Sequence, residues 1–250
     1  MNTHALKTTL TTIGLLAAGA ILPAQTEGDS FALPKPNGAN LYLEAGGVFA
    51  AASMPLDLKI PDLPVTLGIN SDANFTGARL AFGFRVNKQH KVQFEFARLS
   101  GSDDGLSINN GEESFKTDTD YTAMPFTLSY NYCIPLGQTG RWELRLGPSL
   151  GFYNMKASQT LTASYDGESE SISLSDTDST FVYGAGIGLT YHFSKQFHVD
   201  FEYRHLHMGK VEYDFKKTFY DGGDEINFGY KVEVDDMNSH SFALSFGWKF

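Results

Sequence analysis

Two histidines near the end of one predicted strand come nearest, in type and spacing, to a catalytic or metal-binding arrangement. His205 and His207 are two positions apart, so in a strand both side chains share one face. Such a pair can supply a general base, or two metal ligands where loop carboxylates lie nearby. A catalytic base also needs a nucleophile within hydrogen-bond reach, and no serine follows nearby. We therefore expect a solvated or interfacial histidine pair, with no catalytic residue and no metal site.

Acidic pairs in the polar segments are the next candidates, because carboxylates bind calcium. Their spacing matches neither the EF-hand loop nor the calcium-binding nonapeptide repeat, so we interpret them as solvated surface. The pairs are Asp103-Asp104, Glu112-Glu113 and Asp235-Asp236.

Glycines and a cysteine complete the candidates. Gly184, Gly186 and Gly188 alternate along one strand face with no helix signal after them, which favours close packing over a nucleotide-binding loop. Cys133 falls on an inward face near a turn, where a buried inert thiol is expected. No cofactor is therefore expected.

Composition narrows the class of protein. The 250 residues carry a formal net charge of −10, so nucleic acid is an unfavourable partner. A single cysteine excludes a disulfide framework and a cysteine-based metal site. The 25 glycines and the 14% aromatic content suit a β protein with many aromatic anchors.

The first residues have the composition of a targeting segment. Residues 1–24 place Lys7 ahead of an apolar stretch, with small-residue cleavage sites at Ala20 and Ala24. This pattern predicts a secretory signal peptide, the alternative being a short buried helix. Residues 25–39 are expected to be a periplasmic tether. No later apolar run reaches 18 residues, so no transmembrane helix is expected after the signal.

The rest of the chain alternates apolar and polar residues with a period of two, which predicts strands. The last strand, 241–250, carries its large apolar residues on one face: Phe242, Leu244, Phe246, Trp248 and Phe250. Seven similar stretches precede it, at about 40–49, 75–86, 91–99, 121–134, 141–153, 180–193 and 197–206. The connections alternate between long polar segments and tight turns, and 22 of the 29 acidic residues fall in the four long segments.

Charged residues within the strands keep to the face of small residues. They are Glu44, Arg79, Arg85, Glu95, Glu143, Arg145, Asp200, Glu202 and Arg204. A charge that faced lipid at mid-membrane would cost about 2–4 kcal/mol for arginine or lysine. We therefore expect the strands to close into a barrel, with the apolar face outside and these charges paired in a filled lumen. The alternative is a narrow gated water path through the barrel.

Three residues depart from the two-faced pattern. Arg98 falls in phase with the apolar residues of its strand, and its place at the extracellular end predicts an interfacial position. Pro125 is expected to face inward and Pro148 outward. Each proline removes a ladder donor, so we expect a local bulge at both.

Together these features predict an all-β protein, an eight-stranded antiparallel up-and-down transmembrane β-barrel over residues 40–250 with four long extracellular loops. The eight strands, the terminal Phe250 and the loop alternation resemble the small outer-membrane barrels, which include the OmpA membrane domain, OmpX and the opacity-protein group. The resemblance implies residence in the outer membrane of a Gram-negative-type bacterium, with outer-membrane lipid as a partner. It also implies that the last strand is the signal presented to the barrel-assembly machinery.

Function follows less directly, because this fold hosts several activities. We expect a non-enzymatic barrel with a structural or surface-interaction role, its acidic loops meeting an extracellular ligand. The alternative is porin-like transport, by a narrow channel or a conduit for a small apolar solute. A remote alternative is a lipid-modifying enzyme, since the stretch around His205 faintly resembles the lipid A deacylase barrels, although His207 stands where their serine is found. A soluble lipid-binding barrel would need the opposite orientation of its faces.

Overall fold

The computed structural model describes residues 40–59, 66–109, 113–165, 168–221 and 224–250. The expected signal peptide and tether lie outside this part of the chain. Within the described residues, no helix is long and apolar enough to cross a membrane.

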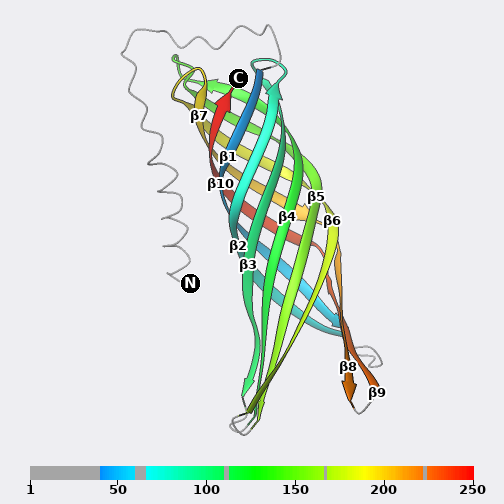
Figure 1. Cartoon of the computed structure of the whole chain (residues 1–250). Coiled ribbons are helices and arrows are strands. Elements are labelled where there is room, and N and C mark those ends of the chain that lie inside the picture. Colours follow the sequence, from blue (N-terminus) through cyan, green and yellow to red (C-terminus); the bar gives the residue numbers. More distant parts are fainter. Residues whose placement is uncertain (1–39, 60–65, 110–112, 166–167, 222–223) are drawn as a thin grey trace.

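Ten antiparallel strands make up the described chain, and eight of them close into a ring (Figure 1). The ring runs from β1 to β7 in sequence order and is closed by β10, which pairs with both β7 and β1. The predicted eight-stranded up-and-down barrel is thereby confirmed. The strands are β1 Asn40–Lys59, β2 Thr66–Arg85, β3 His90–Asn109, β4 Glu113–Leu136, β5 Trp142–Tyr165, β6 Glu168–His192, β7 Phe197–Met208, β8 Val211–Asp221, β9 Asp224–Val234 and β10 Met237–Lys249.

The orientation of the strand faces follows the predicted alternation. Phe82, Phe94 and Phe201 project outward with 59%, 41% and 49% of their surface exposed. On the opposite face, Glu44 is 0% exposed and Arg145 is 1% exposed. The barrel thus presents a continuous apolar band to lipid and keeps its ionised groups inside, as a bilayer requires.

The four long segments expected to be loops are mainly strand. β1 and β2 pair from Asn40 with Arg85 up to Lys59 with Thr66, and β5 and β6 pair up to Tyr165 with Glu168. In these extensions the outer face is mainly polar and the apolar residues face inward, so the apolar outer face that marks a membrane strand is absent although the backbone ladder continues.

The last long segment contains a hairpin, β8–β9, that the alternation did not predict. It continues β7 and β10 beyond two bends, at residues 209–210 and 235–236. Asp236 adopts a left-handed conformation, φ 50°, at the second bend. Beyond the bends β9 pairs with the end of β1, from Leu56 to Lys59. The hairpin therefore extends the wall on the extracellular side of β7 and β10.

On the extracellular side of the ring, which is at the bottom of Figure 1, the wall divides into two sheets. The ladder between β2 and β3 ends at Asn74 with Ser102, and the ladder between β6 and β7 ends at Val182 with Met208. One sheet contains the extracellular parts of β3, β4, β5 and β6, and we call it the β3–β6 sheet. The other contains β8 and β9 with the extracellular parts of β1 and β2, and we call it the hairpin sheet. Figure 1 shows β8 and β9 diverging from the tip of the β3–β6 sheet.

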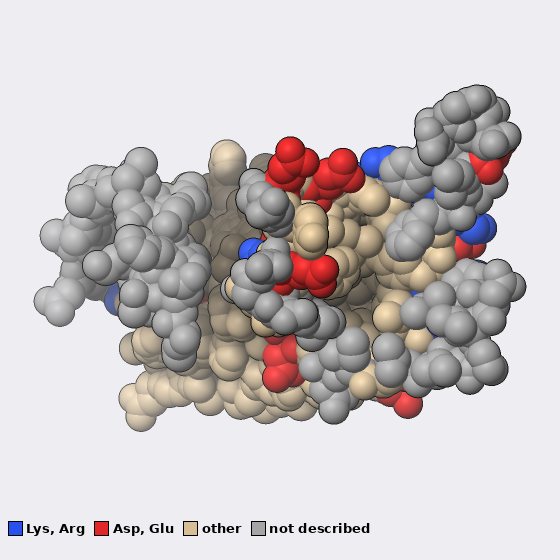
Figure 2. Space-filling view, turned by 90° about the horizontal axis from the view of Figure 1, so that it is seen from below, with Lys and Arg blue, Asp and Glu red and all other residues tan. Residues whose placement is uncertain are grey.

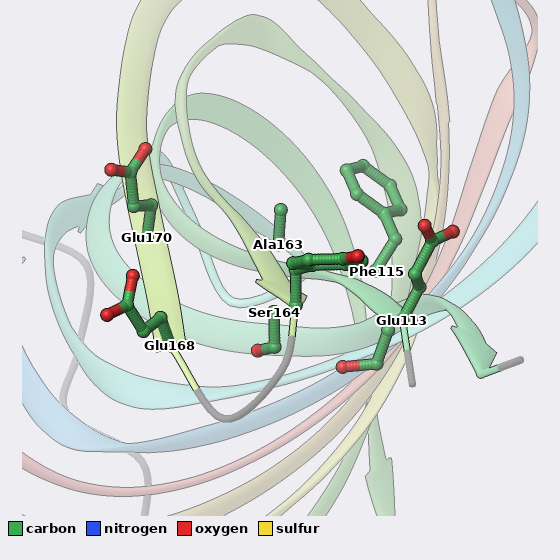
Figure 3. Close-up of a pocket in the computed structure, with 8 residues that line it drawn as sticks. Glu113, Phe115, Ala163, Ser164, Glu168 and Glu170 are labelled. Carbon is green, nitrogen blue, oxygen red and sulfur yellow. The ribbon is translucent and has the colours of Figure 1, made fainter. Parts of the chain in front are cut away.

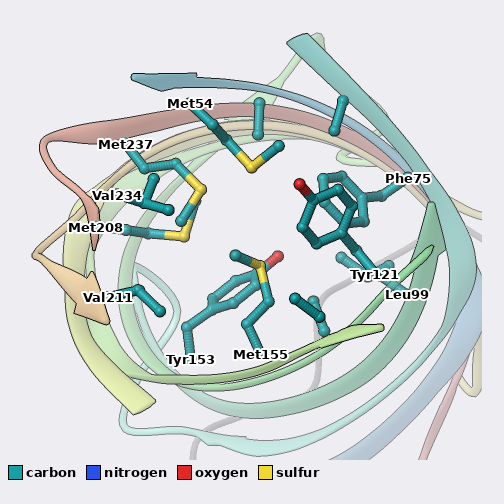
Figure 4. Close-up of a cluster of buried hydrophobic side chains, with 14 of the residues drawn as sticks. Met54, Phe75, Leu99, Tyr121, Tyr153, Met155, Met208, Val211, Val234 and Met237 are labelled. Carbon is teal, nitrogen blue, oxygen red and sulfur yellow. The ribbon is translucent and has the colours of Figure 1, made fainter. Parts of the chain in front are cut away.

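Each strand carries apolar residues inward in its extracellular half (Figure 4). Four methionines from four strands point into this part of the lumen: Met54, Met155, Met208 and Met237, each 1% exposed or less. They pack with Phe75, Tyr121 and other buried apolar side chains in one cluster. The alternation in the sequence predicts small and charged residues inside, so this apolar cluster is an additional feature of the lumen.

The bulges expected at the two prolines are wrong. Pro125 is buried and Pro148 exposed, but the ladders of β4 with β3 and with β5 resume in the same register beyond them. A proline removes a backbone N–H, and with it some of the paired residues of the ladder, but it does not insert an extra residue. The register therefore stays the same on both sides of it. The register shift among the described strands lies elsewhere, between Asp104 and Ser107 of β3.

Candidate functional site

The periplasmic half of the lumen holds a network of ion pairs centred on Arg79. Its guanidinium lies 3.1 Å from Glu44, 2.9 Å from Glu202 and 3.2 Å from Glu95, measured between nitrogen and oxygen atoms. Arg204 joins the same group, with contacts of 3.0 Å to Glu95 and 2.6 Å to Glu202. These residues come from β1, β2, β3 and β7, so the network ties distant parts of the wall together.

Arg145 extends the network from the opposite wall. It forms an ion pair with Asp200 and donates a hydrogen bond of 3.3 Å to Gln93 Oε1. Asp200 also accepts a bond of 2.7 Å from Thr190 Oγ1. The side chain of Arg145 lies over Gly188, where an added Cβ would meet its Nη2 at 3.0 Å. Gly186 and Gly188 thus leave room for the large ionic side chains, whereas an added Cβ at Gly184 would meet the backbone of His205.

A second group closes the periplasmic mouth. Arg85 pairs with Glu143 at 2.7 Å between Nη2 and Oε2. Glu44 accepts bonds from Lys91 Nζ, at 2.7 Å, and lies 3.1 Å from His198 Nε2. The structure therefore brings all nine predicted charges into one buried region. It adds Lys91, Gln93 and His198, which the sequence analysis left out although they share strand phase with predicted members.

The network is balanced, because five cations face five carboxylates. Paired and hydrogen-bonded charges are the form in which ions tolerate burial. A balanced set leaves no excess charge to attract ions of one sign along the lumen. The arrangement therefore favours a plug over a selective pore.

A shallow pocket lies at the extracellular tip of the β3–β6 sheet (Figure 3). Its walls come from the ends of β4, β5 and β6. Glu113, Glu168 and Glu170 border it, together with the exposed aromatic side chains of Phe115 and Tyr165. Three carboxylates beside two aromatic rings can receive a cationic side chain by ion pairing and by contact with the ring faces.

The charges of the extracellular end are unevenly distributed. Figure 2 shows carboxylates over the middle of this face and most of the visible basic groups toward one side. The hairpin sheet and its bend carry lysines, among them Lys59, Lys210 and Lys231, which pair with Glu233 or Glu212. The tip of the β3–β6 sheet is therefore the acidic part of this surface.

The candidate histidines, His205 and His207, lie on the outer wall. His205 is exposed and packs against His240 of β10, with 4.6 Å between ring centroids. His207 Nδ1 lies 3.2 Å from Asn238 Oδ1. Across the described residues, no group of three or more histidine, cysteine or acidic side chains is placed to hold a metal ion. Cys133 is fully buried on the inward face near the periplasmic turn.

The C-terminal strand has its large apolar residues on the outer face. Phe242, Trp248 and Phe250 are exposed there. Phe250 donates its backbone N–H to Leu41 O at 2.9 Å, at the closing pair of strands. Arg98 is exposed on the outer face, consistent with its phase.

Comparison with known proteins finds a matching family model and similar solved structures. Residues 15–250 match the family model described as outer membrane protein beta-barrel domain. The outer membrane protein OprG from Pseudomonas aeruginosa is a similar solved structure, with a TM-score of 0.54 and 16% identity over 87% of this chain and 99% of that chain. Neisserial surface protein A is another, with a TM-score of 0.47 and 16% identity over 86% and 100% of the two chains. No curated protein matches the sequence.

Proposed function

Since this chain belongs to the outer membrane protein β-barrel domain family, we propose that it is a non-enzymatic anchor whose two extracellular sheets interact with a partner outside the cell. The protein is an integral protein of the outer membrane of a Gram-negative bacterium, and its lipid-facing band is the apolar surface described above. Its fold leaves the activity open, so the proposal is argued from the lumen and the extracellular sheets.

The observation that supports the proposal is that buried side chains gather inside the lumen at two levels. The balanced ionic network fills the periplasmic half, where Arg79, Arg145 and Asp200 are each 2% exposed or less. The apolar cluster lies inside the extracellular half. A solute path through the barrel would have to displace both. The accessible polar surface is instead on the sheets that extend above the membrane.

Planar-bilayer recording tests this role directly. The refolded protein is expected to insert without discrete conductance steps, because the ionic network and the apolar cluster are both buried inside the lumen. A larger general porin, reconstituted in the same lipid, serves as the positive control. Steady unitary currents from the protein would contradict the anchor role and favour the channel.

A second candidate function is a conduit for a small apolar solute, favoured by the apolar lining of the extracellular lumen. Tyr213, 1% exposed within that lining, has a hydroxyl without a hydrogen-bond partner among the described residues. An apolar molecule with one acceptor group would satisfy it. Uptake of a labelled medium-chain alcohol by cells that express the protein tests this candidate. Uptake equal to that of cells without the protein would exclude it.

The non-enzymatic part of the proposal has its own test. The masses of lipid A extracted from expressing and non-expressing cells are expected to be the same. A mass shift that a His205→Ala variant abolishes would establish the lipid-modifying alternative instead. In the described part of the chain His205 packs against His240 and forms no hydrogen bond with a serine, which supports the expected result.

A further inference from the structure

The free edge of β6 is the starting observation. β6 pairs with β5 along its whole length but with β7 only from Val182 to His192. The N–H of His192 bonds toward β5, whereas Phe181 O accepts from Gly209 on the other side. Main-chain groups of odd-numbered residues therefore face away from β5. In the described part of the chain, no backbone ladder covers this edge over residues 168–181.

Two carboxylates occupy the part of that edge nearest the ring. Asp178 accepts one bond from the N–H of Ser179 in its own strand, 2.7 Å, and another from the N–H of Glu212 in β8, 2.8 Å. Asp176 does the same for Thr177, 2.8 Å, and Asp214, 2.7 Å. Side chains thus stand where a ladder would otherwise join β6 to β8. They hold the two strands apart by the width of a carboxylate.

The part of the edge farther from the ring is open to solvent. Ser169, Ser171, Ser173 and Ser175 are exposed, and their main-chain groups face the side from which β8 diverges (Figure 1). Unpaired N–H and C=O groups on a strand edge are the template for adding another strand. Proteins commonly protect such an edge with charge, and here the charge is negative only: Glu168 and Glu170 lie on the same segment.

The acidic pocket adjoins this edge. Glu168 and Glu170 belong both to the open segment of β6 and to the pocket wall, and Phe115 and Tyr165 complete the pocket (Figure 3). A second copy of this chain would bring the same carboxylates against each other, so self-pairing is disfavoured. A basic partner would instead neutralise them.

We propose that residues 168–175 of β6, with the adjoining tip pocket, bind an extended lysine- or arginine-rich polypeptide segment that adds to the sheet as a strand. Alternate main-chain groups of the segment pair with the odd-numbered residues of β6, and a basic side chain enters the pocket between Glu168, Glu170 and Glu113. The inference rests on the proposed surface-interaction function and specifies the chemistry of its partner.

The test uses the mature chain refolded in nanodiscs and a fluorescent twelve-residue peptide of alternating lysine and threonine. Anisotropy is expected to show saturable binding that weakens with salt. The same peptide with its four central amides N-methylated keeps the charge but loses strand pairing, and we expect it to bind about tenfold or more weakly. A glutamate–threonine peptide is expected not to bind.

Variants of the protein locate the contact. Ser173→Pro removes an edge donor without touching the ladder to β5 and is expected to weaken binding about tenfold, whereas Ser173→Ala leaves it unchanged. A double Glu168→Gln, Glu170→Gln variant weakens binding and flattens its salt dependence. Each variant is first shown to fold by the heat-dependent gel migration of the intact barrel.

Three results would overturn the inference. Equal binding of the N-methylated peptide or of Ser173→Pro would show attraction by charge alone, and absence of binding to the folded protein would show no site. Self-association of the protein at the same edge would replace the basic partner by a second copy. The bilayer recording is independent of these measurements, so a conducting barrel that still binds the peptide would contradict the anchor role and leave the docking edge intact.

Discussion

At the scale of the residue, the lumen shows how ions are kept inside a membrane protein. Arg79 alone contacts three carboxylates within 3.2 Å, and each of those carboxylates has a second cationic or polar partner. Removal of one member leaves others buried and unpaired, which costs more than the pair contributes. The network therefore fixes the register of the strands that supply it.

Arg145→Met is expected to lower the free energy of unfolding by about 3–5 kcal/mol, because buried Asp200 loses its nearest cation and keeps only the longer contact of 3.8 Å to Arg79. Urea unfolding in detergent micelles measures the change. Arg98→Met is the matched control, and its exposed outer position predicts a change within about 0.5 kcal/mol. Similar losses for the two variants would show that the lumen pairing contributes little.

Glu233, in the extracellular extension, gives a pH-dependent contact. Hydrogen bonds from Lys59 and then from Lys210 lower the pKa of Glu233 to about 2. A carboxylate with a depressed pKa stabilises the fold above its ordinary value of 4.5, and this stability is lost as the pH falls from there toward 2. Protection of β9 amides from hydrogen exchange should fall over that interval.

Carboxyl carbon NMR locates the titration. The midpoint of Glu233 is expected near 2 in the native protein. A variant with both Lys59→Met and Lys210→Met should shift it back toward 4.5. An unchanged midpoint in this variant would mean that other groups set the acidity.

At the scale of the element, the extracellular wall is joined by two kinds of seam. Most neighbouring strands form continuous ladders, whereas β6 and β8 are joined through Asp176 and Asp178. Side-chain oxygens satisfy the N–H groups of both strands, but they keep the strands farther apart than a ladder does. This spacing lets the hairpin sheet separate from the β3–β6 sheet.

Replacement of Asp176 and Asp178 by alanine is expected to speed hydrogen exchange at the amides of Glu212 and Asp214. A bond to a charged acceptor contributes about 1.5–3 kcal/mol, so the increase should be tenfold or more. Ser175→Ala, on the exposed face of the same strand, should leave these rates unchanged. Equal protection in the double variant would show that β8 is held by other contacts.

At the scale of the whole molecule, closure depends on the first and last strands. β1 and β10 pair from Tyr42 with Lys249 to Ser53 with Asn238, and Phe250 adds a bond to Leu41. Closing the ring removes the two open edges that lipid would not tolerate. The exposed aromatic residues of β10 remain available to the assembly machinery during insertion, a role we propose for this strand.

Phe250→Ala is expected to reduce the folded barrel in cell outer membranes several-fold while leaving refolding in detergent nearly unchanged, because the backbone contact to Leu41 is kept. The fraction of heat-modifiable protein measures both. Phe193→Ala removes another exposed aromatic residue that lies outside the C-terminal strand. An equal loss for this control would argue against a specific terminal signal.

The membrane part of the fold was predictable from the alternation of residues such as Phe82 and Arg79. Lipid excludes charge so strongly that one face must be apolar, and the period-two pattern is then unambiguous. Lys91 and His198 belong to the same inward faces, but each stands at the start of a strand, where the phase is least evident. The bulges expected at Pro125 and Pro148 failed because a proline can drop ladder pairs without inserting a residue.

By itself the sequence determined the ring of eight strands, the outward apolar band and the set of charges inside, because the bilayer penalises any other orientation of those residues. Only the tertiary structure decided which charges meet, that the extracellular half of the lumen is apolar, and that the polar segments fold into two sheets. Above the membrane, water accepts polar residues on the outer face, so the alternation weakens. Contacts between strands distant in sequence then decide the structure, including the carboxylate seam beside β6.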